Sequence, residues 1–145
     1  MYPKLRPADD TPEQREYTYW MHAAEGSVAP FLVMALVFNK VETAPVPFFL
    51  KPVVKGIAKK VQGSFINPNL ERQTAFINDT LSKTGWFAGD SLTGADIMMS
   101  FACEGLAVRA DLNKAPAIRD FLNTIHARPA YKAALEKGGP YELMS

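Results

Sequence analysis

The sequence predicts an all-α domain, a helical bundle of five to six helices, and three observations carry that prediction. Apolar residues recur at intervals of three and four along most of the chain, as they do on the buried face of a helix. Runs of alternating β-branched residues, which are typical of strands, do not occur. Proline and glycine interrupt the pattern at spacings that suit separate helices. The 145 residues, 48% of them apolar and 21% charged, fit one domain with a packed core.

The first ten residues differ from the rest of the chain. Residues 1–10 hold two prolines and an acidic pair, so we expect a linker or tail there. The helical domain is then expected to cover residues 11–145. Thr11 is the expected N-cap of the first helix, because Pro12 suits the first helical position and Gln14 completes a capping box.

Two long helical stretches follow. In the first, apolar spacing continues to about residue 42 but is interrupted by Gly26 and Pro30, which predicts a kinked helix or two consecutive helices. The second runs from about residue 50 to residue 83, and Pro68 is expected to break or bend it. A glycine then follows as a stop signal.

A helix start deep in the chain is encoded by local chemistry. Thr93 can serve as an N-cap, and Asp96, three positions later, can reach back to the Thr93 amide. Leu92 and Ile97 stand at the two positions of a hydrophobic staple. This structural capping role explains Asp96 without assigning it any catalytic chemistry.

Two shorter helices are predicted after this one. They cover Pro116 to about Ala127 and Pro129 to about residue 137. His126 falls in the last turn of the first of them, where a histidine favours the helix dipole.

Composition and missing motifs exclude several functions. The formal net charge of +1 argues against a nucleic-acid partner. The single cysteine, Cys103, excludes an internal disulfide, is expected to be buried and unreactive, and fits a reducing, cytoplasmic setting. Two histidines and one cysteine make a zinc site improbable, so no metal is expected. The longest apolar run, residues 28–38, is well short of the roughly 18 residues of a membrane span. No nucleotide-binding glycine motif and no catalytic serine or cysteine motif occurs, so no catalytic residue is assigned.

The stretch from residue 20 to residue 27 allows two interpretations. It places His22, Glu25 and Ser27 around the point where the first helix is expected to bend. A bend of this kind frees backbone groups and opens a groove. The stretch is then either a core tryptophan with surface polar residues, or an edge that faces a ligand or partner.

Three stretches together resemble a known family. They are Trp20 with His22, Glu25, Gly26 and Ser27; Phe-Ala-Gly-Asp-Ser-Leu-Thr-Gly-Ala-Asp at residues 87–96; and His-Ala-Arg-Pro-Ala-Tyr at residues 126–131. In this order they resemble the helical C-terminal domain of the cytosolic glutathione transferase superfamily, and most of all its fungal and bacterial members. The resemblance covers residues 11–137.

The resemblance implies a function and a missing part. Members of the family carry a thioredoxin-like domain of about 80 residues, a usual domain length, before the helical one. That domain supplies most of the glutathione site and the side chain that activates the thiol. The resemblance therefore implies that this chain is an excised or truncated domain, inactive alone. Its implied partners are that thioredoxin-like domain, a second copy in a homodimer, and a hydrophobic electrophile to be detoxified with glutathione as co-substrate.

The resemblance also implies a binding surface on the first helix. Glu25 is expected to reach the glutathione amine, across the dimer or within one chain, because a carboxylate pairs with an ammonium group. The electrophile site is expected to be an apolar wall. Its implied substrate-binding residues are Tyr19, His22, Ala23, Ser27 and Phe31.

Two other functions stay open on the sequence. Similar domains occur as non-catalytic interaction modules, and an exposed apolar face would be the mark of such a module. An unrelated helical protein could instead use the basic face between Lys51 and Lys60 to bind an anionic surface.

Overall fold

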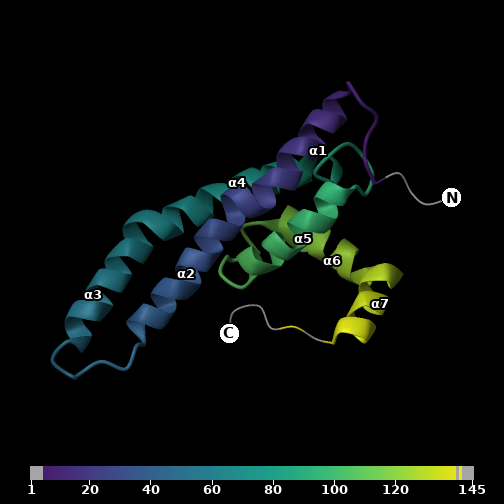
Figure 1. The fold of residues 1–145 in the computed structure, drawn as a ribbon. Coiled ribbons are helices and arrows are strands. Elements are labelled where there is room, and N and C mark those ends of the chain that lie inside the picture. Colours follow the sequence, from purple (N-terminus) through teal and green to yellow (C-terminus); the bar gives the residue numbers. More distant parts are fainter. Residues whose placement is uncertain (1–4, 140, 142–145) are drawn as a thin grey trace.

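The computed structural model describes residues 5–139 and Tyr141, and all regular secondary structure in these residues is helical (Figure 1). Five continuous helical segments are present there, in agreement with the predicted bundle. In chain order the elements are α1 (Pro12–Ala23), η1 (Ala24–Val28), α2 (Ala29–Glu42), α3 (Lys51–Val61), η2 (Gln62–Ile66), α4 (Asn67–Thr84), α5 (Gly94–Ala107), α6 (Pro116–Ala127) and α7 (Pro129–Gly138).

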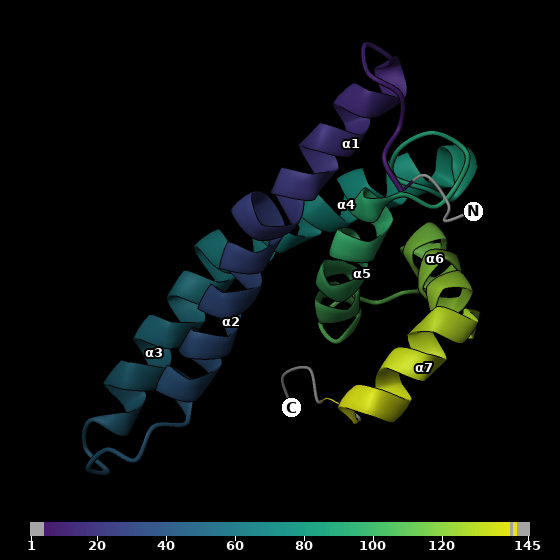
Figure 2. The ribbon, with the colours of Figure 1, turned by 45° about the vertical axis from the view of Figure 1, so that its right-hand side comes forward.

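The two long segments form an antiparallel hairpin. One arm runs through α1, η1 and α2, and the other runs back through α3, η2 and α4; the arms lie side by side in both Figure 1 and Figure 2. The helices α5, α6 and α7 pack beside one end of this hairpin. The α2–α3 end projects away from them (Figure 2).

Neither proline interrupts its helical segment, although the second arm changes direction between α3 and α4, near Pro68 (Figures 1 and 2). Pro30 and Pro68 each occupy the second position of an α-helix that directly follows a π-helical turn, η1 or η2. A π turn bonds residue i to residue i+5, and this local change of register coincides with the position at which the proline nitrogen has no hydrogen to donate. Helical structure therefore continues through both arms.

The core is centred on α5. Its buried side chains include Met99, Cys103 and Leu106; α5 packs against the first hairpin arm on one side and against α6 on the other, and α6 in turn packs on α4. Cys103 is fully buried, as predicted, and burial raises the pKa of its thiol. At Gly105 a Cβ atom would lie 2.7 Å from Leu32 Cδ1, so the absence of a side chain lets α2 approach α5 closely.

The first arm also has the length and composition of a membrane-crossing helix. This applies to Pro12–Glu42 as one continuous helix. The core helix of a water-soluble protein passes the same test. Here the arm buries Trp20, Val28, Leu32 and Ala35 in the bundle core, and 28% of its most apolar window is buried.

The segment before α1 returns to the start of α5. The Gly94 N–H donates to the Leu5 carbonyl at 2.7 Å, and Thr11 caps α1 by accepting from the Gln14 N–H at 3.2 Å. Residues 1–4 of the expected tail, together with residues 140 and 142–145, lie outside the described residues.

Candidate functional site

The π turn η1 is the central feature of the candidate site. Ala24 and Val28 are buried at this turn and anchor it to the core, whereas Glu25 and Gly26 are exposed. The turn packs against α5, so its position is set by the most buried helix of the bundle. Residues on either side of η1 therefore occupy a fixed surface.

Tyr19 lies before the turn, on the side that faces α4. Its ring meets Trp20 edge-on at 5.0 Å and Phe76 of α4 edge-on at 6.2 Å between centroids. Trp20 in turn stacks on Phe76 at 5.2 Å. The Tyr19 residue is still 51% exposed, so it offers a ring held in place by aromatic contacts and open to a ligand.

Phe31 lies after the turn, on the side that faces η2. It is half-buried, and its ring centroid is 5.9 Å from that of Phe65 in η2. Of the other expected contact residues, Ala23 is buried, Ser27 is half-buried and His22 is exposed. The structure brings Tyr19 and Phe31 against the second arm but does not gather all of these side chains in one cavity.

The two clefts described in the structure lie elsewhere. The larger, of about 850 Å³, lies between the start of α4 and the loop after α5 and is lined by residues that include Gln62 and Arg109. The smaller, of about 530 Å³, lies beneath the α2–α3 loop and is lined by Lys51 and Lys55 among others. The expected substrate-binding residues line neither.

The helix start at Thr93 is built around a buried carboxylate. Asp96 Oδ2 accepts from the Thr93 N–H at 2.7 Å and from the Thr93 hydroxyl at 2.8 Å. The Asp96 N–H in turn donates to the Thr93 side chain, which completes a capping box. Asp96 Oδ1 accepts from the Phe87 N–H at 2.8 Å, a contact that the capping pattern alone does not predict. Burial raises the pKa of Asp96, while the hydrogen bonds from Phe87 and Thr93 act in the opposite direction.

This carboxylate orders the turn that precedes α5. Gly85 and Gly89 adopt positive φ angles of 82° and 80°, which a residue with a side chain rarely adopts. Phe87, held by its bond to Asp96, inserts between Trp20 and Phe121, with centroid distances of 4.7 and 5.2 Å. Asp96 thereby connects the turn to the helix that carries the candidate site.

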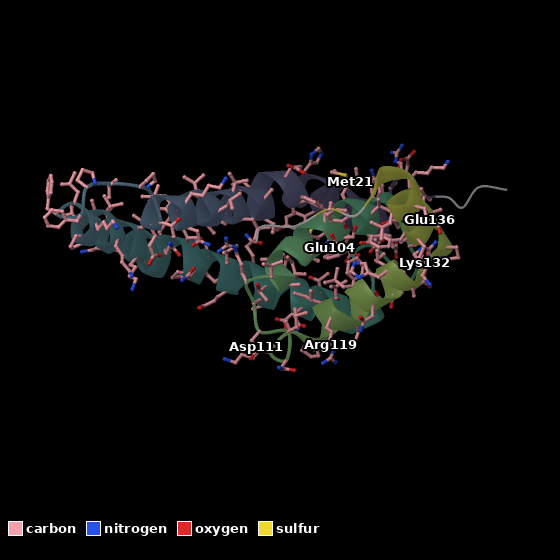
Figure 3. All side chains as sticks on the ribbon, turned by 90° about the horizontal axis from the view of Figure 1, so that it is seen from below. Met21, Glu104, Asp111, Arg119, Lys132 and Glu136 are labelled. Carbon is pink, nitrogen blue, oxygen red and sulfur yellow. The ribbon has the colours of Figure 1, made fainter. Side chains whose placement is uncertain are left out.

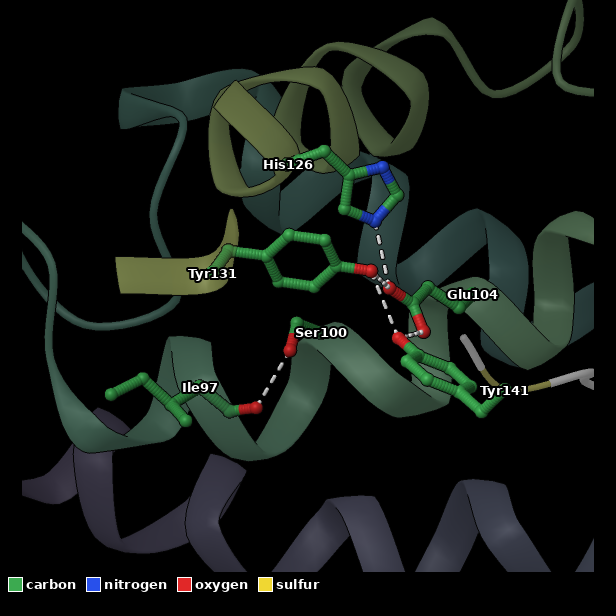
Figure 4. Close-up of polar contacts among 6 residues, drawn as sticks. All are labelled: Ile97, Ser100, Glu104, His126, Tyr131 and Tyr141. Carbon is green, nitrogen blue, oxygen red and sulfur yellow. Dashed lines mark hydrogen bonds and ion pairs between the residues drawn. The ribbon is translucent and has the colours of Figure 1, made fainter. Parts of the chain in front are cut away.

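A second buried carboxylate, Glu104, is a feature that the sequence analysis missed (Figure 4). Glu104 Oε1 lies 2.7 Å from His126 Nε2 and accepts from the Tyr131 hydroxyl at 3.1 Å. Glu104 Oε2 accepts from the Tyr141 hydroxyl at 2.6 Å, and the two tyrosine hydroxyls are 2.9 Å apart. His126 does lie in the last turn of α6, but it also connects that helix to α5.

The Glu104 cluster ties the last helices to the centre of the bundle. Burial raises the pKa of Tyr131 and of Tyr141, and the carboxylate of Glu104 raises both further. The sequence signal that could have revealed it is an acidic residue inside an otherwise apolar run, Ala-Cys-Glu-Gly-Leu at residues 102–106. A buried carboxylate requires donors, and the histidine and tyrosine near the chain end were candidates.

One side of α5 remains uncovered and apolar. Phe101 is 58% exposed, and its ring lies 6.3 Å from that of Tyr141. Ile97, which was expected to complete a hydrophobic staple, is also exposed. The exposed apolar residues of this α5 face are Ile97, Met98, Phe101 and, just past the helix end, Val108.

Among the described residues, no three histidine, cysteine, aspartate or glutamate side chains gather as metal ligands. The polar clusters are Asp96 with its donors and Glu104 with its donors. Both have their hydrogen-bonding capacity occupied by other groups of the chain, so their evident role is to hold elements in place.

Comparisons with known proteins agree with this architecture. The family described as "Glutathione S-transferase, C-terminal domain" matches residues 46–138. The chain is 29% identical over 133 residues to Glutathione S-transferase 1 of Saccharomyces cerevisiae, covering 90% of this chain and 57% of that one. It is 27% identical over 138 residues to Glutathione S-transferase 3 of Schizosaccharomyces pombe, covering 93% and 56%. The chain thus spans little more than half the length of these relatives.

Solved structures show the same fold. A glutathione transferase of Phanerochaete chrysosporium, solved with oxidized glutathione, superposes with a TM-score of 0.64 at 18% identity, covering 93% of this chain and 57% of that chain. A beta-class enzyme of Sphingomonas chungbukensis gives 0.63 at 17% identity, covering 93% and 59%. The helical hairpin, the capped α5 and the family match lead to one conclusion: the chain belongs to the glutathione S-transferase superfamily and has the fold of its C-terminal helical domain.

Proposed function

We propose that this chain is the helical domain of a glutathione transferase-like protein, in which it forms the wall of the hydrophobic electrophile site and contributes dimer contacts. The observation that carries this proposal is the surface around η1. There the exposed ring of Tyr19 contacts Trp20 and Phe76, and the Glu25 carboxylate is exposed. Phe31 lies on the other side of the turn and is half-buried. An apolar wall beside a carboxylate suits a ligand that combines an apolar group with an ammonium group.

In this proposal the chain binds the electrophile, and another part of the protein activates the glutathione thiol. Conjugation requires the glutathione thiolate, which a protein favours by lowering the pKa of the thiol. No side chain of this chain is assigned that role. His22, Ala23 and Ser27 would complete the surface on which the electrophile rests, and Glu25 would pair with the glutathione amine. The chain alone should therefore bind ligand weakly and catalyse no conjugation.

The uncovered α5 face supports a docking partner for this domain. It is apolar, lies on the helix that η1 packs against, and includes Phe101, which is more than half exposed. A thioredoxin-like domain seated on it would bring its glutathione site close to Glu25. We further propose that the two-domain protein forms a homodimer and that it resides in the cytoplasm.

The alternative is a non-catalytic interaction module. The same α5 face favours it, since an exposed apolar surface is typical of protein docking sites. In that case the face would bind a protein, and the surface around η1 would take no small ligand.

Amide-resolved NMR titration of this chain with S-hexyl glutathione, and separately with glutathione, distinguishes the two functions. We expect S-hexyl glutathione to shift amides between residues 19 and 31, because its hexyl group supplies apolar contact, and glutathione to shift them less. Tyr19→Ala should weaken binding of S-hexyl glutathione. Glu25→Gln should weaken both ligands.

The matched control for Glu25→Gln is Glu136→Gln, which neutralises an exposed carboxylate on α7. It should leave both titrations unchanged. Shifts confined to other parts of the chain, or no shifts at millimolar ligand, would contradict the proposed electrophile site and favour the interaction module.

A further inference from the structure

The α2–α3 end of the hairpin exposes aromatic side chains at its extreme. The Leu50 N–H donates to the Pro47 carbonyl at 2.9 Å, which closes a turn whose central residues are Phe48 and Phe49. These two phenylalanines are 84% and 65% exposed, and their rings contact only edge-on, at 5.7 Å. The turn directs both rings into solvent, where their exposure is unfavourable.

The helix that follows extends this apolar surface. Leu50, Val53 and Ile57 are all exposed, and their spacing of three and four places them on one face of α3. We call Phe48, Phe49, Leu50, Val53 and Ile57 the tip patch. Of the eleven residues of α3 only Ala58 is buried, and Val54 and Val61 are half-buried; the helix packs on α2 along one side and leaves its other sides open.

Positive charge lies mainly on the side of α3 opposite the tip patch. Lys51, Lys55 and Lys59 recur every four residues on another face of α3, and Lys60 follows directly. All four are exposed. Glu42 is the one acidic residue between residues 40 and 60, and it lies 4.0 Å from Lys55. The end of the hairpin is therefore apolar at its extreme and along one side of α3, and basic along the opposite side.

We propose that this tip docks on an anionic phospholipid surface, with Phe48 and Phe49 inserted among the acyl chains and the lysines of α3 against the lipid phosphates. Aromatic and aliphatic side chains next to lysines are the composition of interfacial membrane anchors. Each lysine near an anionic leaflet strengthens binding. This binding goes beyond the proposed function, and it is independent of ligand binding around η1.

The shape of the molecule allows this contact. The hairpin extends away from the bundle, whose far end carries charged residues such as Lys132 and Glu136 of α7 (Figure 3). A flat surface can thus meet the tip without touching α5, α6 or α7. A second copy of the chain suits the tip less well, because a twofold contact would place one set of lysines against the other.

Vesicle co-sedimentation of the full chain tests the proposal. We expect binding to phosphatidylcholine vesicles that contain about 30% phosphatidylserine, and little binding to phosphatidylcholine alone. Raising the salt concentration from about 0.1 M to about 1 M should weaken binding, because the Debye length falls from about 10 Å to about 3 Å.

Paired variants separate the two contributions. Phe48→Ser with Phe49→Ser should lower the vesicle partition constant about tenfold or more, whereas Phe48→Leu with Phe49→Leu should largely preserve it. Replacing Lys51, Lys55 and Lys59 by Gln should also lower it about tenfold or more. The matched control is Lys132→Gln with Lys137→Gln on α7, which should have no effect.

Three results would overturn the proposal. They are equal binding to vesicles with and without phosphatidylserine, no binding at low salt, and a parent chain whose tip is occupied by a second copy. The last would appear in sedimentation velocity as a dimer that Phe48→Ser with Phe49→Ser dissociates. Because the substituted side chains are exposed, these variants should fold, and the far-UV circular dichroism spectrum verifies it.

Discussion

The bundle end of the molecule and the tip of its hairpin use the same secondary structure and differ in what their helices bury. At the bundle end, α5 buries eight of its fourteen residues, two of them carboxylates that accept three hydrogen bonds each. At the tip, α3 buries one of its eleven residues. The comparison teaches that the buried core and its paired carboxylates lie at the bundle end, whereas the tip contributes exposed apolar surface and little buried core.

The buried carboxylates explain why the bundle end holds together. Asp96 joins a turn to a helix, and Glu104 joins α5 to α6, α7 and Tyr141. A buried acceptor with all its donors present fixes geometry more strictly than apolar contact alone. Substitutions at these two positions should therefore have large effects, and substitutions at the tip should have small ones.

The largest effect is expected for Asp96→Ala. It leaves the N–H groups of Phe87 and Thr93 without acceptors inside the protein, so the free energy of unfolding should fall by about 2–4 kcal/mol. Asp96→Asn keeps one acceptor oxygen and should cost less. Chemical denaturation measures both.

Asp90→Ala is the matched control for this substitution. Asp90 is an exposed aspartate in the same turn, and its removal should change the free energy of unfolding by less than about 0.5 kcal/mol. Equal stability of Asp96→Ala and the parent chain would show that the capping carboxylate does not hold the bundle.

A somewhat smaller loss is expected for Glu104→Ala. Tyr131, Tyr141 and His126 would lose their common acceptor, but the His126 side chain is 41% exposed and can bind water instead. We expect a loss of about 2–3 kcal/mol, and about 1 kcal/mol for Tyr131→Phe. The variant that combines Glu104→Ala with Tyr131→Phe should lose less stability than the sum of the two single losses. A loss equal to that sum would show that the cluster does not act as a unit.

The tyrosines of this cluster should also give the chain an alkaline transition. The pKa values of Tyr131 and Tyr141 are raised in the folded chain, whereas an unfolded tyrosine ionises near pH 10. Their contribution to stability is complete below about pH 10 and is lost as the pH rises toward the raised values. Denaturation curves at increasing pH should show this fall, and Glu104→Gln should make it shallower. A fall of the same steepness in Glu104→Gln would contradict the assigned cause.

The smallest effect on stability is expected at the tip. Phe48→Ser with Phe49→Ser removes side chains that contact little besides each other, so the free energy of unfolding should change by less than about 0.5 kcal/mol. The same pair of substitutions should change vesicle binding about tenfold or more. A loss of stability above about 2 kcal/mol would mean that the tip is part of the folded core.

Much of the fold could be predicted because its signals are local. Apolar spacing, the cap at Thr11 and the box formed by Thr93 and Asp96 depend on residues within a few positions of one another. The continuity of the helices through Pro30 and Pro68 could not be predicted, since it depends on π turns that apolar spacing does not reveal. The Glu104 cluster joins residues 22 to 37 positions apart, and only packing brings them together.

The candidate site shows the same limit. The resemblance assigns residues along one helix, and the apolar spacing of that helix does not reveal which second helix lies beside it. The structure places Phe76 beside Tyr19 and Phe65 beside Phe31. Those partners come from the other arm of the hairpin, and no spacing within residues 19–31 points to them.

Native-state hydrogen exchange, resolved by amide, tests the separation of the two ends most directly. The account predicts that the Phe87 and Thr93 amides, and those in the middle of α5, exchange only through global unfolding, whereas amides of α3 exchange through local opening at a clearly lower free energy. Exchange of α3 and α5 at one common free energy would contradict it, because the tip would then be as firmly held as the bundle.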